Sequence, residues 1–236
     1  MSYSVKLHVW GEAACFTRPE MKVERVSYDV MTPSAARGVL EAIYWKPQMR
    51  WEIERIHLLK PVRFTNLRRN EVGVKASAAN AKSAIKSGSG SLGLYIEDER
   101  QQRAGTILRD VGYVIEGRIV ALDAENPAEK HYHMFKRRAE KGQCFQRPYL
   151  GCREFLADFA WVENELPACE LSQSERNRDL GFMLLDIAYT PATGKAYDVI
   201  ESNTGKKLLA QPQFFRAALK AGVMEVPAVT STEVVA

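Results

Sequence analysis

The chain has 236 residues, of which 46% are hydrophobic and 26% charged, and its formal net charge is +4. These values predict one large domain or two small ones and exclude an intrinsically disordered chain. No run of about 18 apolar residues occurs, which excludes a membrane span, and the N-terminus lacks the pattern of a signal peptide. We therefore expect a cytoplasmic protein without a membrane partner.

The first part of the chain predicts a strand, a helix and a second strand. Residues 3–16 begin with apolar residues at every second position, the pattern of a half-buried strand. Residues 32–46 predict a helix, because Thr32 is a suitable N-cap and Pro47 forces the end. Residues 51–65 are again apolar enough for a strand.

Residues 66–108 differ in composition from the rest of the chain. They are rich in Arg, Lys, Asn, Ala, Ser and Gly, and serine alternates with glycine from Ser87 to Ser91. This composition predicts a long basic hairpin or insertion with a mobile tip. A phosphate-binding P-loop is excluded, because no Gly-Lys-Ser/Thr sequence follows a strand here.

A strand at 110–122, a helix at 126–142 and a strand at 149–162 follow the insertion. The resulting order of strands and helices is the split β-α-β arrangement of the ferredoxin-like fold. We therefore predict an α+β protein whose ferredoxin-like, RRM-like βαββαβ domain covers residues 1–162. This fold class includes RNA-recognition modules, but a fold alone does not determine a function.

The remainder of the chain predicts a small C-terminal β domain at 163–226. Two strands are expected there, at 180–189 and at 197–200. Residues 213–221 predict a short helix opened by a proline. The last ten residues, 227–236, have the composition of an unpacked tail.

The segment from Asn126 to Gly142 is the most informative helix of the sequence. Asn126 is a suitable N-cap, Pro127 suits the first helical position, and Glu129 can complete a capping box. Gly142 is a natural stop. Spacings of four, three and four place the apolar residues on one face that can be buried. These residues are Ala128, Tyr132, Phe135 and Ala139.

The same helix concentrates positive charge beside a histidine. From Lys130 to Arg147 the sequence has six Lys or Arg and one acid, Glu140. His131 follows Lys130 near the N-terminus of the helix, where free amide groups and the macrodipole attract phosphate. This combination points to nucleic-acid binding or phosphodiester chemistry. A solvated surface helix remains an equally open interpretation of the segment alone.

Several kinds of active site have no support in the sequence. The acidic pairs, Glu52 with Glu54 and Asp98 with Glu99, form no pattern typical of a metal nuclease. No nucleophile elbow of a serine hydrolase occurs, and the four cysteines have spacings that fit neither a zinc site nor a disulfide framework. We expect neither a metal nor a cofactor.

The remaining chemistry uses the 2′-hydroxyl of RNA as the nucleophile. An enzyme then has only to align this oxygen with the adjacent phosphorus, move protons and stabilise the developing charge. The expected products are a 2′,3′-cyclic phosphate and a 5′-hydroxyl. His131, Lys130 and a tyrosine supply suitable groups. Tyr44, at the end of the first helix, is the best tyrosine candidate, although its pattern alone favours a tyrosine at the edge of the core.

Three long segments carry a resemblance to a known family. They run from Ser34 to Pro47, from Phe135 to Phe145 and from Arg147 to Phe155. They resemble the CRISPR-associated RAMP proteins of type I-C systems, the Cas-five family of subtype d. The resemblance extends over residues 3–225 and implies a ferredoxin-like domain with a small C-terminal β domain.

The resemblance also implies an activity and partners. Such a protein cuts precursor CRISPR RNA within each repeat without a metal, at the 3′ base of the repeat hairpin. It then keeps the 5′ handle and joins the backbone, large and small subunits of the Cascade complex, which meets target DNA near the PAM. The alternative is a subunit that only binds the handle and has no catalytic role.

By match of motif, the family's catalytic tyrosine, lysine and histidine fall on Tyr44, Lys130 and His131. His133 is a second histidine close to this pair. The resemblance together with charge and position places further residues on the phosphates of the RNA. These are Arg68, Arg69, Arg137, Arg138 and Lys141.

Overall fold

The computed structural model describes residues 3–21, 23–90, 92–194, 196–201 and 204–235, which form a mixed α/β structure with two antiparallel sheets. The elements are β1 (Ser4–Ala14), α1 (Pro33–Ile43), β2 (Met49–Leu58), β3 (Phe64–Val72), α2 (Ala78–Ser87), β4 (Arg100–Ala121), α3 (Ala128–Glu140), β5 (Asp158–Trp161), β6 (Arg178–Pro191), β7 (Val199–Ile200), β8 (Lys207–Leu219) and β9 (Val223–Glu225).

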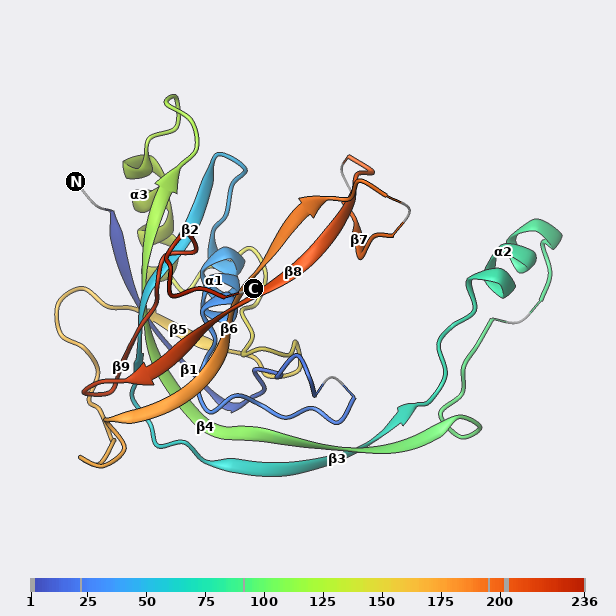
Figure 1. Ribbon diagram of the computed structural model, residues 1–236, viewed down its shortest axis with the longest axis horizontal. Coiled ribbons are helices and arrows are strands. Elements are labelled where there is room, and N and C mark those ends of the chain that lie inside the picture. The colour runs from blue at the N-terminus through green and yellow to red at the C-terminus, as the bar shows by residue number, and fades with distance from the viewer. Residues whose placement is uncertain (1–2, 22, 91, 195, 202–203, 236) are drawn as a thin grey trace.

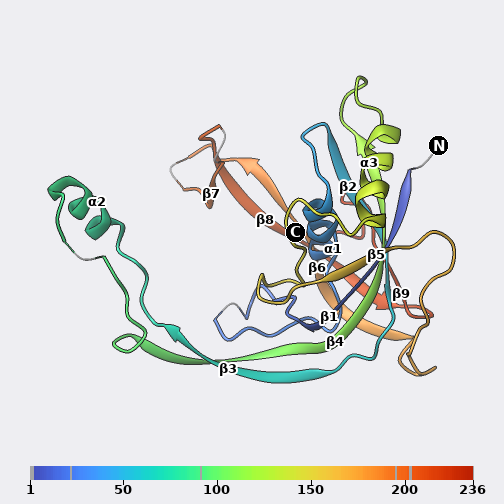
Figure 2. The ribbon, with the colours of Figure 1, turned by 180° about the vertical axis from the view of Figure 1, so that it is seen from behind.

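The larger sheet has the strand order β5-β1-β4-β2-β9, and β3 pairs with β4 outside this path. Helices α1 and α3 contact each other and pack on its strands, and Figure 2 shows both helices on the near side of the sheet. Leu40 of α1, Phe135 of α3 and Ile115 of β4 are fully buried in one core. Gly117 permits this packing, since a Cβ there would lie 2.8 Å from Leu40 Cδ1.

The predicted first helix and its N-cap are confirmed. The Thr32 hydroxyl accepts a hydrogen bond from the backbone N–H of Ala35 at 3.3 Å, and Pro33 is the first helical residue. Apolar residues three and four positions apart, such as Ala36, Val39 and Leu40, are buried. The helix ends where Tyr44 adopts an extended backbone conformation.

This cap gives a stability prediction with an internal control. Replacing Thr32 by alanine removes an N-cap, which costs about 1 kcal/mol in a typical helix. Ser77 caps α2 in the same way, with 3.2 Å between its Oγ and the N–H of Asn80. Because α2 has no buried residue, we expect Thr32→Ala to lower the midpoint of chemical denaturation and Ser77→Ala to leave it unchanged. Equal shifts of the midpoint in the two variants would show that the cap of α1 contributes no more to stability than the cap of the exposed α2.

The start of α3 differs from the prediction. The N-cap is Pro127, without a side-chain cap, and Asn126 lies one residue outside the helix. The backbone N–H of Asn126 donates instead to the Asp123 carboxylate at 2.7 Å, so the local turn holds it away from the capping position. The capping box is likewise wrong, because no side-chain cap is made there and Glu129 lies 3.8 Å from His133 Nε2. The stop at Gly142 is confirmed, with φ of +64°.

A long two-stranded arm leaves the sheet. β3 pairs with the first half of β4, from Phe64 opposite Leu108 to Val72 opposite Arg100. Helix α2 lies at the far end of the arm, well away from the other elements (Figure 1). This helix was not predicted from the sequence, although Ser77 and Gly88 mark its two ends as N-cap and C-cap. The predicted mobile tip includes Ser91, which lies outside the described residues.

Three predictions in the C-terminal half are wrong. The expected strand at 149–162 is reduced to β5, because turns and a single bridge between Tyr149 and Leu156 precede it. Most of the expected helix at 213–221 lies in β8, where every second residue from Phe215 to Leu219 is buried. The expected unpacked tail pairs through Val235 with Phe214, with hydrogen bonds of 2.7 and 2.9 Å. In both of these last cases, pairing with a neighbouring strand decides the conformation.

The smaller sheet has the order β6-β8-β7 and is tied to the larger one. Arg37 of α1 donates two hydrogen bonds, at 2.6 and 2.9 Å, to the Asp186 carboxylate on β6. β9 follows β8 in the chain and is the edge strand of the larger sheet, where it pairs with β2. The Arg37–Asp186 contact links α1, which ends next to Tyr44, to the smaller sheet. No helix of the described residues is long and apolar enough to cross a membrane.

Candidate active site

The structure brings two of the predicted site residues together. Tyr44 Oη and His131 Nδ1 lie 2.9 Å apart, within hydrogen-bonding distance, and the two rings are tilted by 44°. Both side chains are almost fully buried, with exposed fractions of 3% for Tyr44 and 2% for His131. Residues 87 positions apart in sequence are therefore joined where α1 ends and α3 begins.

Neighbouring groups hold Tyr44 from its backbone and from its ring. Trp51 Nε1 donates to the Tyr44 carbonyl at 3.0 Å. Arg138 Nη1 donates to the Ile43 carbonyl at 2.8 Å, and its guanidinium lies 5.2 Å from the centre of the Tyr44 ring. A cation over a ring face at this distance stabilises the contact. The tyrosine is thus held on three sides before any ligand arrives.

The environment keeps both members of the pair uncharged near neutral pH. Burial lowers the pKa of His131, and the positive charges of Lys130 and Lys46 lower it further, while Asp123 acts in the opposite direction. Burial raises the pKa of Tyr44, and the nearby Arg138 partly offsets this. A neutral phenol hydrogen-bonded to a neutral imidazole can relay protons without charge separation, provided that one proton enters the pair as another leaves it.

The second ring nitrogen of His131 is a buried polar atom without a partner. Among the described residues, no hydrogen-bonding group reaches Nε2. Buried polar groups are almost always paired, so an unpaired ring nitrogen marks a place where a ligand atom would be stabilised.

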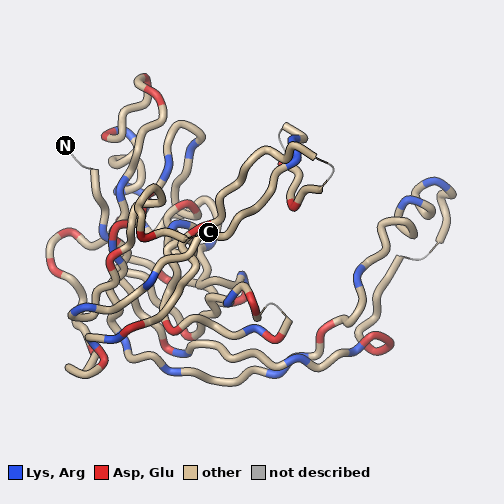
Figure 3. The backbone as a smooth tube through the Cα atoms, in the orientation of Figure 1, with Lys and Arg blue, Asp and Glu red and all other residues tan. Residues whose placement is uncertain are grey.

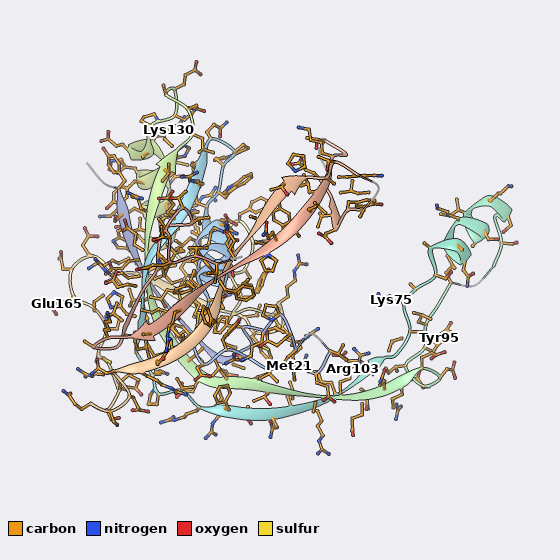
Figure 4. The ribbon with its side chains drawn as sticks, viewed as in Figure 1. Met21, Lys75, Tyr95, Arg103, Lys130 and Glu165 are labelled. Carbon is orange, nitrogen blue, oxygen red and sulfur yellow. The ribbon has the colours of Figure 1, made fainter. Side chains whose placement is uncertain are left out.

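Lys130 and His133 are not part of this contact. Lys130 Nζ donates to Asn126 Oδ1 at 2.8 Å at the exposed start of α3, where Figure 4 labels it. His133 is exposed and lies beside Glu129. The two histidines therefore differ in burial, since His131 is buried and His133 is exposed. Lys130 is adjacent to His131 in sequence, but its ammonium group binds Asn126 and not the pair.

The predicted RNA-contacting residues fall into two separate groups. Arg137 and Lys141 are exposed near the end of α3, while Arg138 packs on Tyr44. Arg68 and Arg69 lie on β3, which runs along the bottom of the view in Figure 1 while α3 lies near the top, and Figure 3 shows basic residues in both regions. Arg68 is exposed, whereas Arg69 pairs with Glu154.

A cleft at the end of α1, lined by Trp45 and Arg138 but not by Tyr44 or His131 themselves, was not predicted from the sequence. It has a volume of about 510 Å³ and is lined by Glu41, Trp45, Lys46, Arg138, Phe145 and Tyr149 among others. Arg138 connects the two regions, because it lines the cleft and covers the Tyr44 ring. The only sequence signal for the cleft was the aromatic residue that follows Tyr44.

Comparison with known proteins identifies the family. The family model for CRISPR-associated proteins of the Cas5d type matches residues 4–227. The chain belongs to the Cas5 family. A relative from Mannheimia succiniciproducens, named CRISPR pre-crRNA endoribonuclease Cas5d, is 52% identical over 99% of both chains. A second Cas5d endoribonuclease, from Thermus thermophilus, is 43% identical over 95% of this chain and 91% of its own.

Solved structures share the fold of this Cas5 chain. A CRISPR-associated protein has a TM-score of 0.60 at 21% identity, with 99% of this chain and 96% of that one covered. A functionally uncharacterized protein of Streptococcus mutans, SMU1763c, has a TM-score of 0.63 at 18% identity and similar coverage, 99% and 97%. At such identities the likeness concerns the fold.

Proposed function

We propose that this chain is an endoribonuclease that cuts precursor CRISPR RNA within the repeat. The proposal is supported by the relative at 52% identity, whose name gives that activity. The observation that carries it is the buried hydrogen bond between Tyr44 Oη and His131 Nδ1. This pair offers two exchangeable protons in a site where the imidazole has a free second nitrogen.

The chemistry that we propose moves protons through the pair. The 2′-oxygen attacks the adjacent phosphorus, and the bond from phosphorus to the 5′-oxygen breaks. Tyr44 Oη takes the proton of the 2′-hydroxyl as it passes its own to His131 Nδ1, and Nε2–H donates to the leaving 5′-oxygen. The products are a 2′,3′-cyclic phosphate and a 5′-hydroxyl, and His131 ends as the other neutral tautomer. Neither a phenolate nor a metal is needed.

Basic residues complete the proposed site. Lys130 exchanges Asn126 for the phosphate and stabilises its developing charge. Arg137 and Lys141 bind phosphates close to the cut, and Arg68 and Arg69 bind RNA at the arm. Arg138 acts mainly by covering Tyr44. The cut RNA stays bound by its 5′ handle, and the chain serves as a subunit of the type I-C Cascade complex in the cytoplasm, beside target DNA near the PAM.

We also propose the finer description of the fold. The strand order β5-β1-β4-β2 with two helices on one face fits a ferredoxin-like domain in residues 1–162. The arm from β3 to the start of β4 is then an insertion in that domain. Residues 163–226 form the small C-terminal β part, although β9 pairs with β2.

Cleavage in the presence of a chelator tests the proposal. We expect purified protein to convert the repeat RNA of its host to one discrete pair of products in excess EDTA, at an unchanged rate. The upstream fragment should carry a cyclic phosphate, visible as resistance to phosphatase until acid opens the ring. Loss of cleavage in EDTA that Mg²⁺ restores would contradict the mechanism, and a 3′-hydroxyl product would exclude attack by the 2′-oxygen.

The burial of the pair favours one alternative. With exposed fractions of 3% and 2%, Tyr44 and His131 reach RNA only after a local rearrangement. A structural role for the pair would leave the chain a handle-binding subunit without catalytic activity. In that case the purified protein binds its repeat RNA and releases no product over hours, whatever the pH.

A further inference from the structure

The cleft beside Tyr44 carries two aromatic side chains that face solvent. Trp45 is 50% exposed and Phe145 is 84% exposed, and both line this cleft. Single exposed aromatic residues are common on protein surfaces, but two that line one cleft together form a surface on which a ligand can pack. Neither residue stacks on another aromatic ring in the described part of the chain, so the exposed part of each ring remains available to a ligand.

The backbone fixes both aromatic residues in place. Tyr44 is extended, and since successive side chains of an extended segment point to opposite sides, Trp45 points away from His131. The N–H groups of Phe145 and Gln146 donate to the Ala42 carbonyl at 2.9 and 3.1 Å. The loop after α3 is thereby held against the last turn of α1, and Phe145 lies beside the same cleft as Trp45.

The charges at the cleft fit an anionic, planar ligand. Lys46 and Arg138 line it together with one acid, Glu41, whose pKa is raised by burial. Aromatic side chains combined with cations are the means by which proteins hold unpaired bases, because every base has a ring face that can stack. The volume of about 510 Å³ is within the size range of small-molecule sites and is large enough for one nucleotide.

We propose that this cleft binds one unpaired nucleobase of the RNA, stacked on Trp45 or Phe145, next to the phosphate at Tyr44. This inference rests on the proposed function, because the pair at Tyr44 defines where the RNA lies. The stacked base fixes the register of the strand, so that one 2′-hydroxyl reaches the pair. Trp45 and Phe145 are positioning residues, since they do not touch the reacting atoms.

Binding of an RNA that cannot be cut tests the proposal. The full chain is titrated into fluorescein-labelled, fully 2′-O-methylated repeat RNA, and anisotropy gives the affinity. We expect Trp45→Ala or Phe145→Ala to weaken binding about 5-fold to 100-fold, the range for the loss of one base stack. Trp45→Phe should retain most of the affinity. Phe182→Ala, at an exposed aromatic residue of β6, is the matched control and should bind as the wild type does.

A set of RNAs with one abasic position each then identifies the base. At one position, removal of the base should weaken binding to the wild-type protein. The same removal should not weaken binding to Trp45→Ala or Phe145→Ala, because these variants have already lost the stacking contact. If removal of a base weakened binding to both variants as much as to the wild type at every position, the proposal would be overturned. Unchanged RNA binding by both variants would also overturn the proposal. This holds even if the variants fail to assemble with other protein subunits, since the two aromatic residues would then contact protein and not RNA.

The same RNAs distinguish this inference from the proposed function. If the loss of affinity at one abasic position depends on Trp45 or Phe145 but the unmodified repeat is not cut, the base site is supported and the nuclease activity is contradicted. If the repeat is cut but no abasic position shows this dependence, the nuclease activity is supported and the base site is contradicted. Thermal unfolding of each variant completes the test, because both side chains are exposed and their replacement should leave the midpoint unchanged.

Discussion

Replacing His131 by alanine should slow cleavage of repeat RNA by orders of magnitude and leave RNA binding within a few-fold of the wild type. Removal of a group that transfers a proton in the transition state typically costs about 10²-fold to 10⁴-fold in rate. We expect a loss in this range in the single-turnover rate constant, measured with enzyme in excess. Single turnover is the appropriate measurement, because a product that remains bound would mask the chemical step.

Two further variants separate proton transfer from packing. His131→Gln keeps a polar group that can reach the Tyr44 hydroxyl but cannot transfer a proton, so it should be as inactive as His131→Ala and closer to wild-type stability. His133→Ala, two residues along the same helix, removes an exposed histidine and should cleave normally. Loss of activity in His133→Ala with normal activity in His131→Ala would assign the chemistry to the other histidine.

The pH dependence follows from the direction of the His131 shift. Burial lowers the pKa of the folded imidazole below the ordinary value of about 6.5. The His131 imidazole therefore binds its proton at a higher pH in the unfolded chain than in the folded chain. The contribution of the neutral His131 to folding stability is present above about pH 6.5, and it is lost as the pH falls from the pKa of the unfolded chain to that of the folded chain. If the relay needs the neutral ring, the cleavage rate should be constant at neutral pH and decline only in acid.

The sequence predicted several parts of the structure that depend on neighbouring residues, although the N-cap expected at Asn126 was wrong. The cap at Thr32 and the stop at Gly142 are local signals, and the structure confirms both. The strand around β1 follows from alternation along one segment. At β8 and the tail, by contrast, the conformation depends on a partner strand distant in sequence, and the local prediction was wrong.

The candidate site shows the same limit. Periodicity alone placed Tyr44 at the edge of the core, and a resemblance to a family was needed to select it as a site residue. No pattern in the sequence showed that its hydroxyl meets His131 Nδ1. The cleft at Trp45 and Phe145 also depends on how the loop after α3 docks on the end of α1, which is a tertiary contact.

Tyr44→Phe should reduce cleavage nearly as much as His131→Gln, because it removes one oxygen and interrupts the relay at its first step. We expect a decrease of about 10²-fold or more in the single-turnover rate constant. It also leaves His131 Nδ1 buried without a partner, which costs about 1–3 kcal/mol of stability. The thermal unfolding of the variant must therefore be measured as well. The cleavage rates are then compared at a temperature at which both the wild type and the variant are folded.

Tyr28→Phe provides a control for the loss of a buried hydroxyl. The Tyr28 hydroxyl accepts a hydrogen bond from the Leu184 N–H at 3.2 Å, and its ring is as buried as that of Tyr44. This variant should be destabilised to a similar degree and should cleave normally. Residues that act as one unit give strongly non-additive losses, so Tyr44→Phe combined with His131→Gln should be no slower than the slower single variant. Losses that multiply would show that the two side chains act independently, and the relay would then be wrong even if both residues matter.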